Sequence, residues 1–237
     1  MLIDAVLTPA EIALLPQRDL SGTTCVVFDV LRATSSMITG LAHGAAEIHP
    51  ACTIDEAQAL RERFPQAVLG GERHGDPIPG FDIGNSPLEY RKTVAGRSII
   101  TTTTNGTVAL RACGGAARVL VGALLNLSAL AAALKTAGTE SLLLVCAGTF
   151  ETFALEDAHG AGMLIGLIGD AATTDAAENV RIVAAASPDP LTALRSARNG
   201  RALAASGRSA DVEWCAQVSR YNVVGQMEAG VIRLLPA

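Results

Sequence analysis

Short apolar runs, each followed by a turn and then by a helical hydrophobic pattern, recur along the chain. Valine, isoleucine and leucine fill these runs, and glycine, threonine or asparagine follows them. This order is typical of an α/β fold, in which strands and helices alternate. Residues 26–28 and 142–145 are apolar on both faces, as central strands covered by helices must be. We therefore predict an α/β fold, a three-layer αβα sandwich around a mostly parallel or mixed central sheet.

The elements expected from this pattern can be placed along the chain. Strands are predicted at residues 24–28, 47–49, 67–69, 98–101, 118–121, 141–145 and 180–183. Helices are predicted at about residues 34–43, 54–64, 107–113, 127–136, 154–168, 191–205 and 210–217. Glycines and prolines interrupt the alternation at about residues 70–90, where we predict a long polar loop of functional importance. The length of 237 residues suits a single domain, residues 1–237.

Polar residues gather directly after the predicted strands. The clusters occupy residues 29–35, 70–75, 102–107, 126 and 146–149. In open α/β sheets, ligands bind in the crevice beyond the carboxyl ends of the strands. We therefore expect these clusters to converge on one pocket.

The residue types in these clusters favour an anionic ligand. Residues 102–107, TTTNGT, lead from a strand into a helix, where backbone amides, hydroxyls and the helix dipole suit a phosphate or sulfonate. A simple helix cap is the alternative interpretation of these threonines. Arg32 and Arg73 add planar guanidinium groups for oxyanions.

Carboxylates are the second component of the expected site. Asp29 ends a buried apolar strand, where an unpaired carboxylate is costly unless a metal binds it. Glu72 and Asp82 lie in the polar loop, and Glu156 and Asp157 lie at the start of a predicted helix. The alternative role for Glu156 and Asp157 is to compensate the dipole of this helix. Carboxylates beside Asn and Thr oxygens, without histidine pairs at metal spacing, favour Mg²⁺.

Several familiar phosphatase signatures do not fit. Leu31 stands where a haloacid-dehalogenase-type enzyme carries its second aspartate, and no cysteine is followed six positions later by arginine. The glycine-rich residues 70–75 lead into Asp76, so they are not a Walker A loop. The three letters of residues 73–75, RHG, match histidine phosphatases only weakly.

An ordered set of motifs resembles the 2-phosphosulfolactate phosphatase family. The motifs are FDVLRAT (28–34), GGER (70–73), PGFDIGNSP (79–87), TTTNGT (102–107), CAGT (146–149) and LED (155–157). The resemblance implies a Mg²⁺-dependent hydrolase that converts 2-phospho-3-sulfolactate to 3-sulfolactate and phosphate, a step toward coenzyme M or free sulfolactate. Residues 219–225 depart from the family pattern, which more usually carries aspartates and a proline there.

This hypothesis assigns roles to individual residues. The predicted catalytic residues are Asp29, Arg32, Glu72 and Arg73. The predicted substrate-binding residues are Asn85, Thr102, Thr103, Asn105, Gly106 and Thr149. The predicted Mg²⁺ ligands are Asp29, Glu72, Glu156 and Asp157. Whether the nucleophile is Asp29 or a metal-held water stays open at this stage.

Two alternatives to this function remain. One is a phosphatase acting on another small phosphorylated carboxylic acid, because sulfonate and carboxylate sites look alike in sequence. The other is a non-catalytic protein that binds anionic metabolites. A binding protein would need the arginines and the threonine-rich segment, but it would have no use for carboxylates arranged for a metal.

Charge and hydrophobicity exclude some partners. The 18 basic and 23 acidic residues form no basic stripe, which argues against nucleic acid and against an anionic membrane. Apolar runs are interrupted before they reach the length of a membrane span. Without the features of a secretory signal, and with five scattered cysteines that suggest reduced thiols, we expect a cytoplasmic protein. A homodimer is the base-rate expectation for its oligomeric state.

Overall fold

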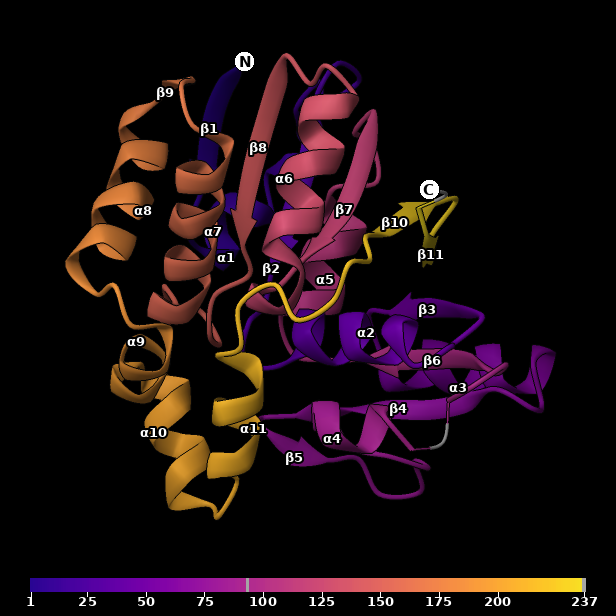
Figure 1. The fold of residues 1–237 in the computed structure, drawn as a ribbon. Coiled ribbons are helices and arrows are strands. Elements are labelled where there is room, and N and C mark those ends of the chain that lie inside the picture. Colours follow the sequence, from indigo (N-terminus) through magenta and orange to yellow (C-terminus); the bar gives the residue numbers. More distant parts are fainter. Residues whose placement is uncertain (93, 236–237) are drawn as a thin grey trace.

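The structure is a computed structural model that describes residues 1–92 and 94–235 (Figure 1). The strands are β1 (Leu2–Val6), β2 (Thr24–Phe28), β3 (Glu47–Ala51), β4 (Val68–Arg73), β5 (Asp76–Pro77), β6 (Ser98–Thr102), β7 (Arg118–Gly122), β8 (Ser141–Cys146), β9 (Ala172–Thr173), β10 (Gly225–Glu228) and β11 (Val231–Leu234). The α-helices are α1 (Pro9–Ile12), α2 (Ala33–Ala42), α3 (Ile54–Arg63), α4 (Pro87–Tyr90), α5 (Gly106–Ala112), α6 (Leu127–Thr136), α7 (Leu155–Ile168), α8 (Asp175–Ala186), α9 (Pro190–Ser196), α10 (Arg198–Ala205) and α11 (Ser209–Cys215).

The described strands form one mixed sheet in the order β5-β4-β6-β3-β11-β10-β7-β2-β8-β1-β9. It contains two groups of parallel strands: β7, β2, β8 and β1 in one, and β3, β6 and β4 in the other. The antiparallel hairpin β10–β11 joins the groups by pairing with β7 and β3. In Figure 1 the first group runs close to vertical and the second close to horizontal.

Helices cover both faces of the central strands. In β2, Val26 and Phe28 pack into a core cluster that includes residues of α6 and α7, whereas Cys25 and Val27 pack into a second cluster with α2 and α5. The alternation arises because successive strand residues point to opposite faces. The prediction of an α/β fold with a mostly parallel, mixed central sheet is confirmed.

Two predicted elements are wrong. Residues 180–183 lie inside helix α8 and form no strand. Within this helix Ala177, Val180 and Ala184 are buried, a spacing that fits one helical face, and a short β-branched run is compatible with either the strand or the helix period. The helix expected over residues 191–205 is divided into α9 and α10 at Ala197, whose backbone is extended.

Several strands were missed by the sequence analysis. β5 and β9 have two residues each, and β1, β10 and β11 lie at the ends of the chain, away from the repeating strand–turn–helix pattern. The hairpin turns at Ala229 and Gly230, which both have positive φ, 49° and 78°, as a tight two-residue hairpin turn requires.

The predicted polar loop at residues 70–90 is partly regular structure. Residues 70–73 complete β4, β5 pairs back onto this strand, and residues 87–90 form α4. Gly71, with φ of 134°, lies so close to β6 that an added Cβ would collide with the carbonyl oxygen of Thr102. Because only glycine permits this approach, the end of β4 can bring Glu72 to the residues that follow β6.

Candidate active site

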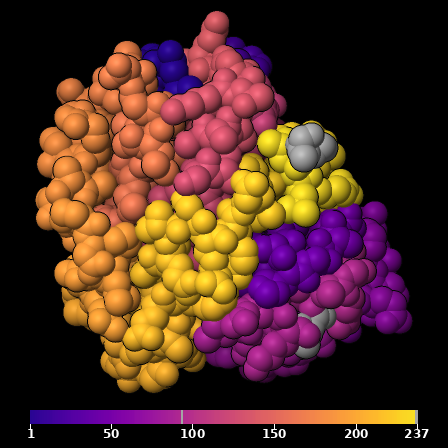
Figure 2. All heavy atoms as spheres, in the orientation of Figure 1, coloured from indigo at the N-terminus to yellow at the C-terminus, as the bar shows by residue number. Residues whose placement is uncertain are grey.

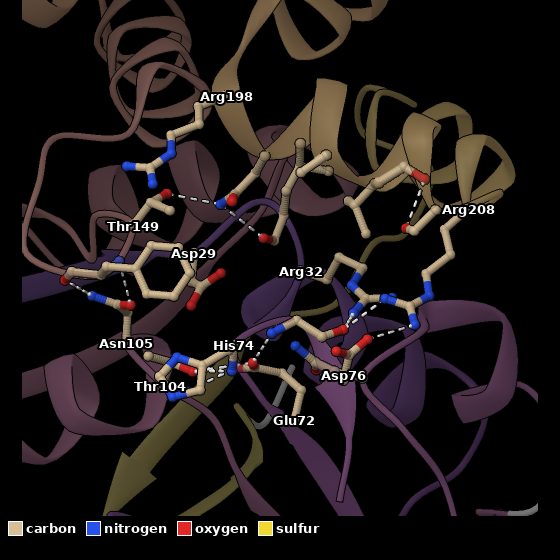
Figure 3. Close-up of a pocket in the computed structure, with 18 of the residues that line it drawn as sticks. Asp29, Arg32, Glu72, His74, Asp76, Thr104, Asn105, Thr149, Arg198 and Arg208 are labelled. Carbon is tan, nitrogen blue, oxygen red and sulfur yellow. Dashed lines mark hydrogen bonds and ion pairs between the residues drawn. The ribbon is translucent and has the colours of Figure 1, made fainter.

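A pocket of about 310 Å³ lies at the ends of several strands, beneath the C-terminal helices (Figure 3). On one side its lining residues come from the segments after β2, β6 and β8 and from the stretch between the end of β4 and α4, and on the other from α10 with the segment after it. In Figure 2 the yellow C-terminal residues fill the surface between the orange and purple parts of the chain. The pocket is therefore built from segments that are far apart in sequence.

Four of the five predicted polar clusters contribute to this pocket: residues 29–35, 70–75, 102–107 and 146–149. Asn126 does not line it. Its fully buried carboxamide accepts from the Ala123 backbone N–H and donates to the carbonyls of Val121 and Val223. Asn126 thus closes the turn after β7 and holds the C-terminal segment in place.

Asp29 follows β2 and is 8% exposed in the pocket. Its Oδ1 accepts a hydrogen bond from the Ala33 N–H at 3.2 Å. Gly106 approaches so closely that an added Cβ would lie 2.5 Å from Asp29 Oδ2. Burial and the negative charges of Glu72 and Glu156 raise the pKa of Asp29 to about 7. A carboxyl group with this pKa is suited to proton transfer or to partnership with a cation.

Glu72 is a rigidly held carboxylate on the same pocket. Its Oε1 accepts from the Thr104 N–H at 2.7 Å, and its Oε2 accepts from the Gly75 N–H at 2.7 Å and from Thr104 Oγ1 at 3.0 Å. These donors come from the loop after β4 and from the segment after β6. Thr104, which was not among the predicted site residues, therefore positions Glu72 and lines the pocket itself.

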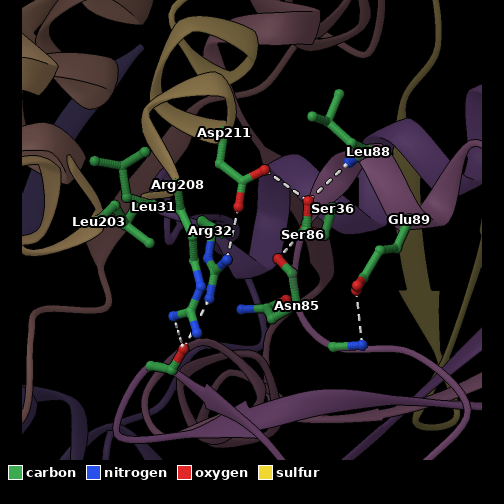
Figure 4. Close-up of polar contacts among 12 residues, drawn as sticks. Leu31, Arg32, Ser36, Asn85, Ser86, Leu88, Glu89, Leu203, Arg208 and Asp211 are labelled. Carbon is green, nitrogen blue, oxygen red and sulfur yellow. Dashed lines mark hydrogen bonds and ion pairs between the residues drawn. The ribbon is translucent and has the colours of Figure 1, made fainter. Parts of the chain in front are cut away.

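Arg32 lines the pocket but is 5% exposed and already paired (Figure 4). Its Nη1 lies 2.7 Å from Asp211 Oδ2, and its Nη2 donates to the Gly75 carbonyl at 3.1 Å. The second oxygen of Asp211 accepts from Ser86 Oγ at 2.6 Å. The guanidinium of Arg32 thus joins α11, the loop before α4 and the turn after β4.

Arg73 and Thr102 do not line the pocket. Arg73 follows Glu72 in β4, and consecutive strand residues point to opposite faces. Its Nη2 donates to Thr102 Oγ1 at 2.7 Å, and its Nη1 donates to the Glu72 carbonyl at 2.8 Å. Of the two neighbouring residues predicted to be catalytic, the fold brings only Glu72 to the pocket.

The segment 102–107 mainly supports local structure. Thr103 and Thr107 each accept a hydrogen bond from the other's backbone N–H, at 3.0 and 3.1 Å, which stabilises the start of α5, and neither lines the pocket. Asn105 does line it, but its carboxamide donates to the carbonyls of Ala147 and Phe150 and accepts from the Phe150 N–H. Gly106 lies beside Asp29 and is absent from the pocket lining.

Asn85 and Thr149, predicted to bind substrate, both line the pocket. Thr149 Oγ1 accepts from Asn199 Nδ2 at 2.8 Å. Asn85 is 5% exposed, and its Oδ1 has no hydrogen-bond partner within the part of the chain that the structure describes. Since buried amide oxygens are normally paired, Asn85 is a candidate for contact with a ligand.

Glu156 and Asp157 are almost completely buried and do not line the pocket. Asp157 accepts from the Val30 N–H at 2.8 Å and from the Gly148 N–H at 3.0 Å, so it ties the end of β2 to the loop after β8. Burial, followed by the charges of Asp29 and Glu156, raises the pKa of Asp157. Burial also raises the pKa of Glu156, whose Oε1 is unpaired among the described residues.

Residues 1–92 and 94–235 contain no cluster of three or more His, Cys, Asp or Glu side chains arranged to hold a metal ion. Of the four predicted Mg²⁺ ligands, Asp29 and Glu72 line the pocket. Burial and repulsion from the neighbouring carboxylates raise the pKa of Asp29, and a bound cation or a proton would relieve this repulsion.

Other lining residues were not anticipated from the sequence. They are His74, Asp76, Phe150, Arg198, Asn199 and Arg208, together with the small or apolar residues around them. His74 lies inside the predicted cluster 70–75, although no role was assigned to it, and Asp76 and Phe150 lie next to predicted clusters, so proximity in sequence was an available signal. Residues from α10 onward had no such signal, because they follow no strand of the pocket.

Residues 219–225, which depart from the family pattern, lie outside the pocket lining. Ser219 accepts from the Ser128 N–H at 3.0 Å at the start of α6, and Tyr221 hydrogen-bonds His43. Neither residue lines the pocket. These contacts indicate that the segment packs the C-terminal part of the chain.

An α/β fold with carboxylates and arginines in a pocket at the strand ends is the architecture of an enzyme for small anionic substrates. A sequence profile described as 2-phosphosulpholactate phosphatase matches residues 9–230. The chain belongs to this family, and with it to the phosphoric monoester hydrolases, which confirms the resemblance seen in the motifs. Within the described residues, no helix is both long and apolar enough to cross a membrane.

Similar curated proteins support this membership. A probable 2-phosphosulfolactate phosphatase of Deinococcus radiodurans is 40% identical over 221 residues, which are 89% of this chain and 92% of the relative. One from Carboxydothermus hydrogenoformans is 36% identical over 234 residues, 97% of this chain and 95% of the relative. One from Symbiobacterium thermophilum is 44% identical over 153 residues, 63% of this chain and 65% of the relative.

Proposed function

We propose that the protein hydrolyses 2-phospho-3-sulfolactate to 3-sulfolactate and phosphate in the pocket at Asp29, with Mg²⁺ as its cofactor. Membership of the family and the names of the relatives support this substrate. The observation that carries the proposal is Asp29 itself, a buried carboxyl with a pKa of about 7 beside the charge of Glu72. A carboxyl group at this position is suited to bind a cation beside a phosphate ester or to transfer a proton.

Asp29 and Glu72 are the residues that would hold Mg²⁺. This ion commonly takes one or two protein carboxylates, with water and substrate phosphate oxygens as its other ligands. An ionised carboxylate offers about four acceptor positions, and the three donors on Glu72 leave one for a cation. When bound, the ion would neutralise charge that develops on the phosphate during displacement.

The chain's own residues supply the remaining chemistry. The pKa of Asp29 is raised to about 7 in the cation-free pocket, and a bound cation would favour its ionised form, in which the carboxylate is a ligand. The Asn85 Oδ1 atom, which is unpaired within residues 1–92 and 94–235, gives the pocket an available hydrogen-bond acceptor. Arg32 acts indirectly, because its pairing with Asp211 and the Gly75 carbonyl positions the pocket wall.

Phosphate release by the purified protein tests this function. We expect turnover of 2-phospho-3-sulfolactate with Mg²⁺ and its loss in EDTA, with 2-phospholactate as the comparison that tests for another phosphorylated acid. Absence of phosphate release from 2-phospho-3-sulfolactate, with and without Mg²⁺, would contradict the proposal.

The site assignment has its own test. Asp29→Asn should lower kcat by roughly a thousandfold or more, since it removes the ionisable group while keeping its size. Asp55→Asn, at an exposed position outside the pocket, is the matched control and should retain wild-type kcat. A near-normal rate in Asp29→Asn would show that the chemistry occurs elsewhere.

A further inference from the structure

The arginines that line the pocket differ in how their charge is compensated. Arg32 pairs with Asp211 at 2.7 Å, and Arg208 pairs with Asp76 at 3.1 Å. In the described ranges 1–92 and 94–235, no ion pair joins Arg198 to an acidic side chain. Among the described residues, its Nη1 makes one long contact, 3.5 Å, with Thr152 Oγ1. Arg198 therefore has positive charge available for a ligand.

Arg198 is nevertheless held at the pocket by an aromatic support. Its guanidinium lies 5.3 Å from the centre of the Phe150 ring, and this ring stacks on His74 with 5.7 Å between centroids. Phe150 is held in turn by Asn105, which contacts both its N–H and its carbonyl. In Figure 3 Arg198 lies above Thr149, on the side of the pocket opposite Arg208. Contacts with Phe150, which His74 and Asn105 hold in turn, therefore support the Arg198 side chain.

The carboxylates of the pocket repel an anionic substrate, and the positive charge of Arg198 offsets part of this repulsion. Asp29 and Glu72 repel an anion unless a cation or a proton lies between them and the phosphate. A substrate with a second oxyanion group brings further negative charge, and the charges of Arg32 and Arg208 are already balanced in part by Asp211 and Asp76. Charge-assisted hydrogen bonds from a guanidinium suit a sulfonate or carboxylate well.

We infer that Arg198, supported by Phe150, binds the second oxyanion group of the substrate and so selects phosphomonoesters that carry another negative group. This inference rests on the proposed function. The phosphate group of the substrate would lie at Asp29 and Glu72, with the cation that they hold, and the sulfonate or carboxylate group would contact Arg198. The segment that contains α10 then acts as the specificity-determining wall of the pocket.

The kinetics of Arg198→Gln on three phosphate esters test this role. For 2-phospho-3-sulfolactate we expect kcat/KM to fall by about ten- to a hundredfold, mainly through KM, since a hydrogen bond to a charged group is lost. For isopropyl phosphate, which has no second anionic group, we expect a change below about twofold. With 2-phospholactate, a retained effect identifies the carboxylate as the group bound, and a vanished effect identifies the sulfonate.

Matched variants separate this role from a loss of structure. Arg201→Gln changes the same residue type on the same helix, outside the pocket lining, and should behave as wild type. Arg198→Lys keeps the charge and should recover part of the affinity. An unchanged KM for 2-phospho-3-sulfolactate in Arg198→Gln, or an equal loss on all three esters, would overturn the inference.

Binding of 3-sulfolactate, measured by calorimetry, separates this inference from the proposed function. The compound retains both the carboxylate and the sulfonate and needs no turnover. Weaker binding to Arg198→Gln than to wild type would support the inference even if the wild type released no phosphate from any ester. Equal affinity of the two proteins would overturn it even if the wild type were an active phosphatase.

Discussion

Among single residues, Asp29 has the most unusual electrostatic environment in the pocket. The sequence placed this carboxylate at the end of a buried strand, and the structure adds the charges of Glu72 and Glu156 around it. Its pKa is raised because burial and those charges both disfavour the ionised form. The same residue should therefore affect stability as well as activity.

We expect stability to depend on pH through Asp29 in the metal-free protein. An unfolded aspartate has a pKa near 3.9, so between about pH 4 and pH 7 the folded state retains a proton that the unfolded state releases. The stabilising effect of this proton is full below pH 4 and is lost as the pH rises to about 7.

Urea unfolding in EDTA measures this effect. From pH 5 to pH 7, the free energy of unfolding of the wild type should fall by roughly 2 kcal/mol relative to Asp29→Asn. Parallel pH profiles of the two proteins would contradict the raised pKa. Addition of Mg²⁺ at pH 7 should stabilise the wild type more than the variant, because the variant lacks one proposed ligand.

Neighbouring residues also show why residue type does not establish a role. Glu72 and Arg73 are adjacent and were both predicted to be catalytic, but only Glu72 lines the pocket. Their side chains point to opposite faces of β4, and the sequence did not indicate which face would meet the pocket.

At the scale of elements, α10 closes one side of the pocket, and α11 supports the pocket from outside its lining. α11 is connected to the α/β sheet by Asp211, which receives hydrogen bonds from Arg32 and Ser86. α10 contributes Arg198 and Asn199 to the lining. Figure 4 shows how Arg32 and Arg208 approach each other below α11. Both donate to the Gly75 carbonyl, at 3.1 and 2.7 Å.

Asp211→Asn should destabilise the protein substantially. It leaves Arg32, whose side chain is 5% exposed, without a counter-charge, and loss of one partner of a buried pair costs about 3 kcal/mol or more. The control Asp76→Asn removes the partner of Arg208, and since the side chain of Asp76 is 79% exposed, it should cost less than about 1 kcal/mol. Chemical denaturation compares the two, and equal small losses would show that the buried pair is dispensable.

At the scale of the whole molecule, the hairpin β10–β11 joins the two groups of parallel strands. Ile232 is fully buried and pairs in register with Ile48 of β3, while Met227 faces Val119 of β7. The last strands of the chain therefore sit in the middle of the sheet. We expect the stability of both groups to depend on this hairpin.

Ile232→Ala tests this dependence. Removal of a fully buried isoleucine side chain should lower the free energy of unfolding by about 2–5 kcal/mol. Leu234→Ala, in the same strand but 44% exposed, should lower it by less than about 1 kcal/mol. A melting experiment that gives the same transition for both variants would contradict a central role for the hairpin.

The sequence predicted the interior strands of this fold well and the ends of the chain poorly. β2 and β8 were evident because they are apolar on both faces, which local pattern alone reveals. The hairpin was missed because its strands are short and partly exposed, and residues 180–183 were mistaken for a strand because a short β-branched run suits either period.

The sequence by itself determined the class of fold, the family and the positions of polar residues at strand ends, because these follow from local periodicity and from motifs in a given order. Only the tertiary structure decided which of those residues share a pocket. Arg198 reaches it, and Asp211 pairs with the lining residue Arg32, from segments more than a hundred residues beyond Asp29 and Arg32, with no local signal. Side-chain direction, burial and charge pairing depend on such long-range packing, so they appear only once the chain has folded.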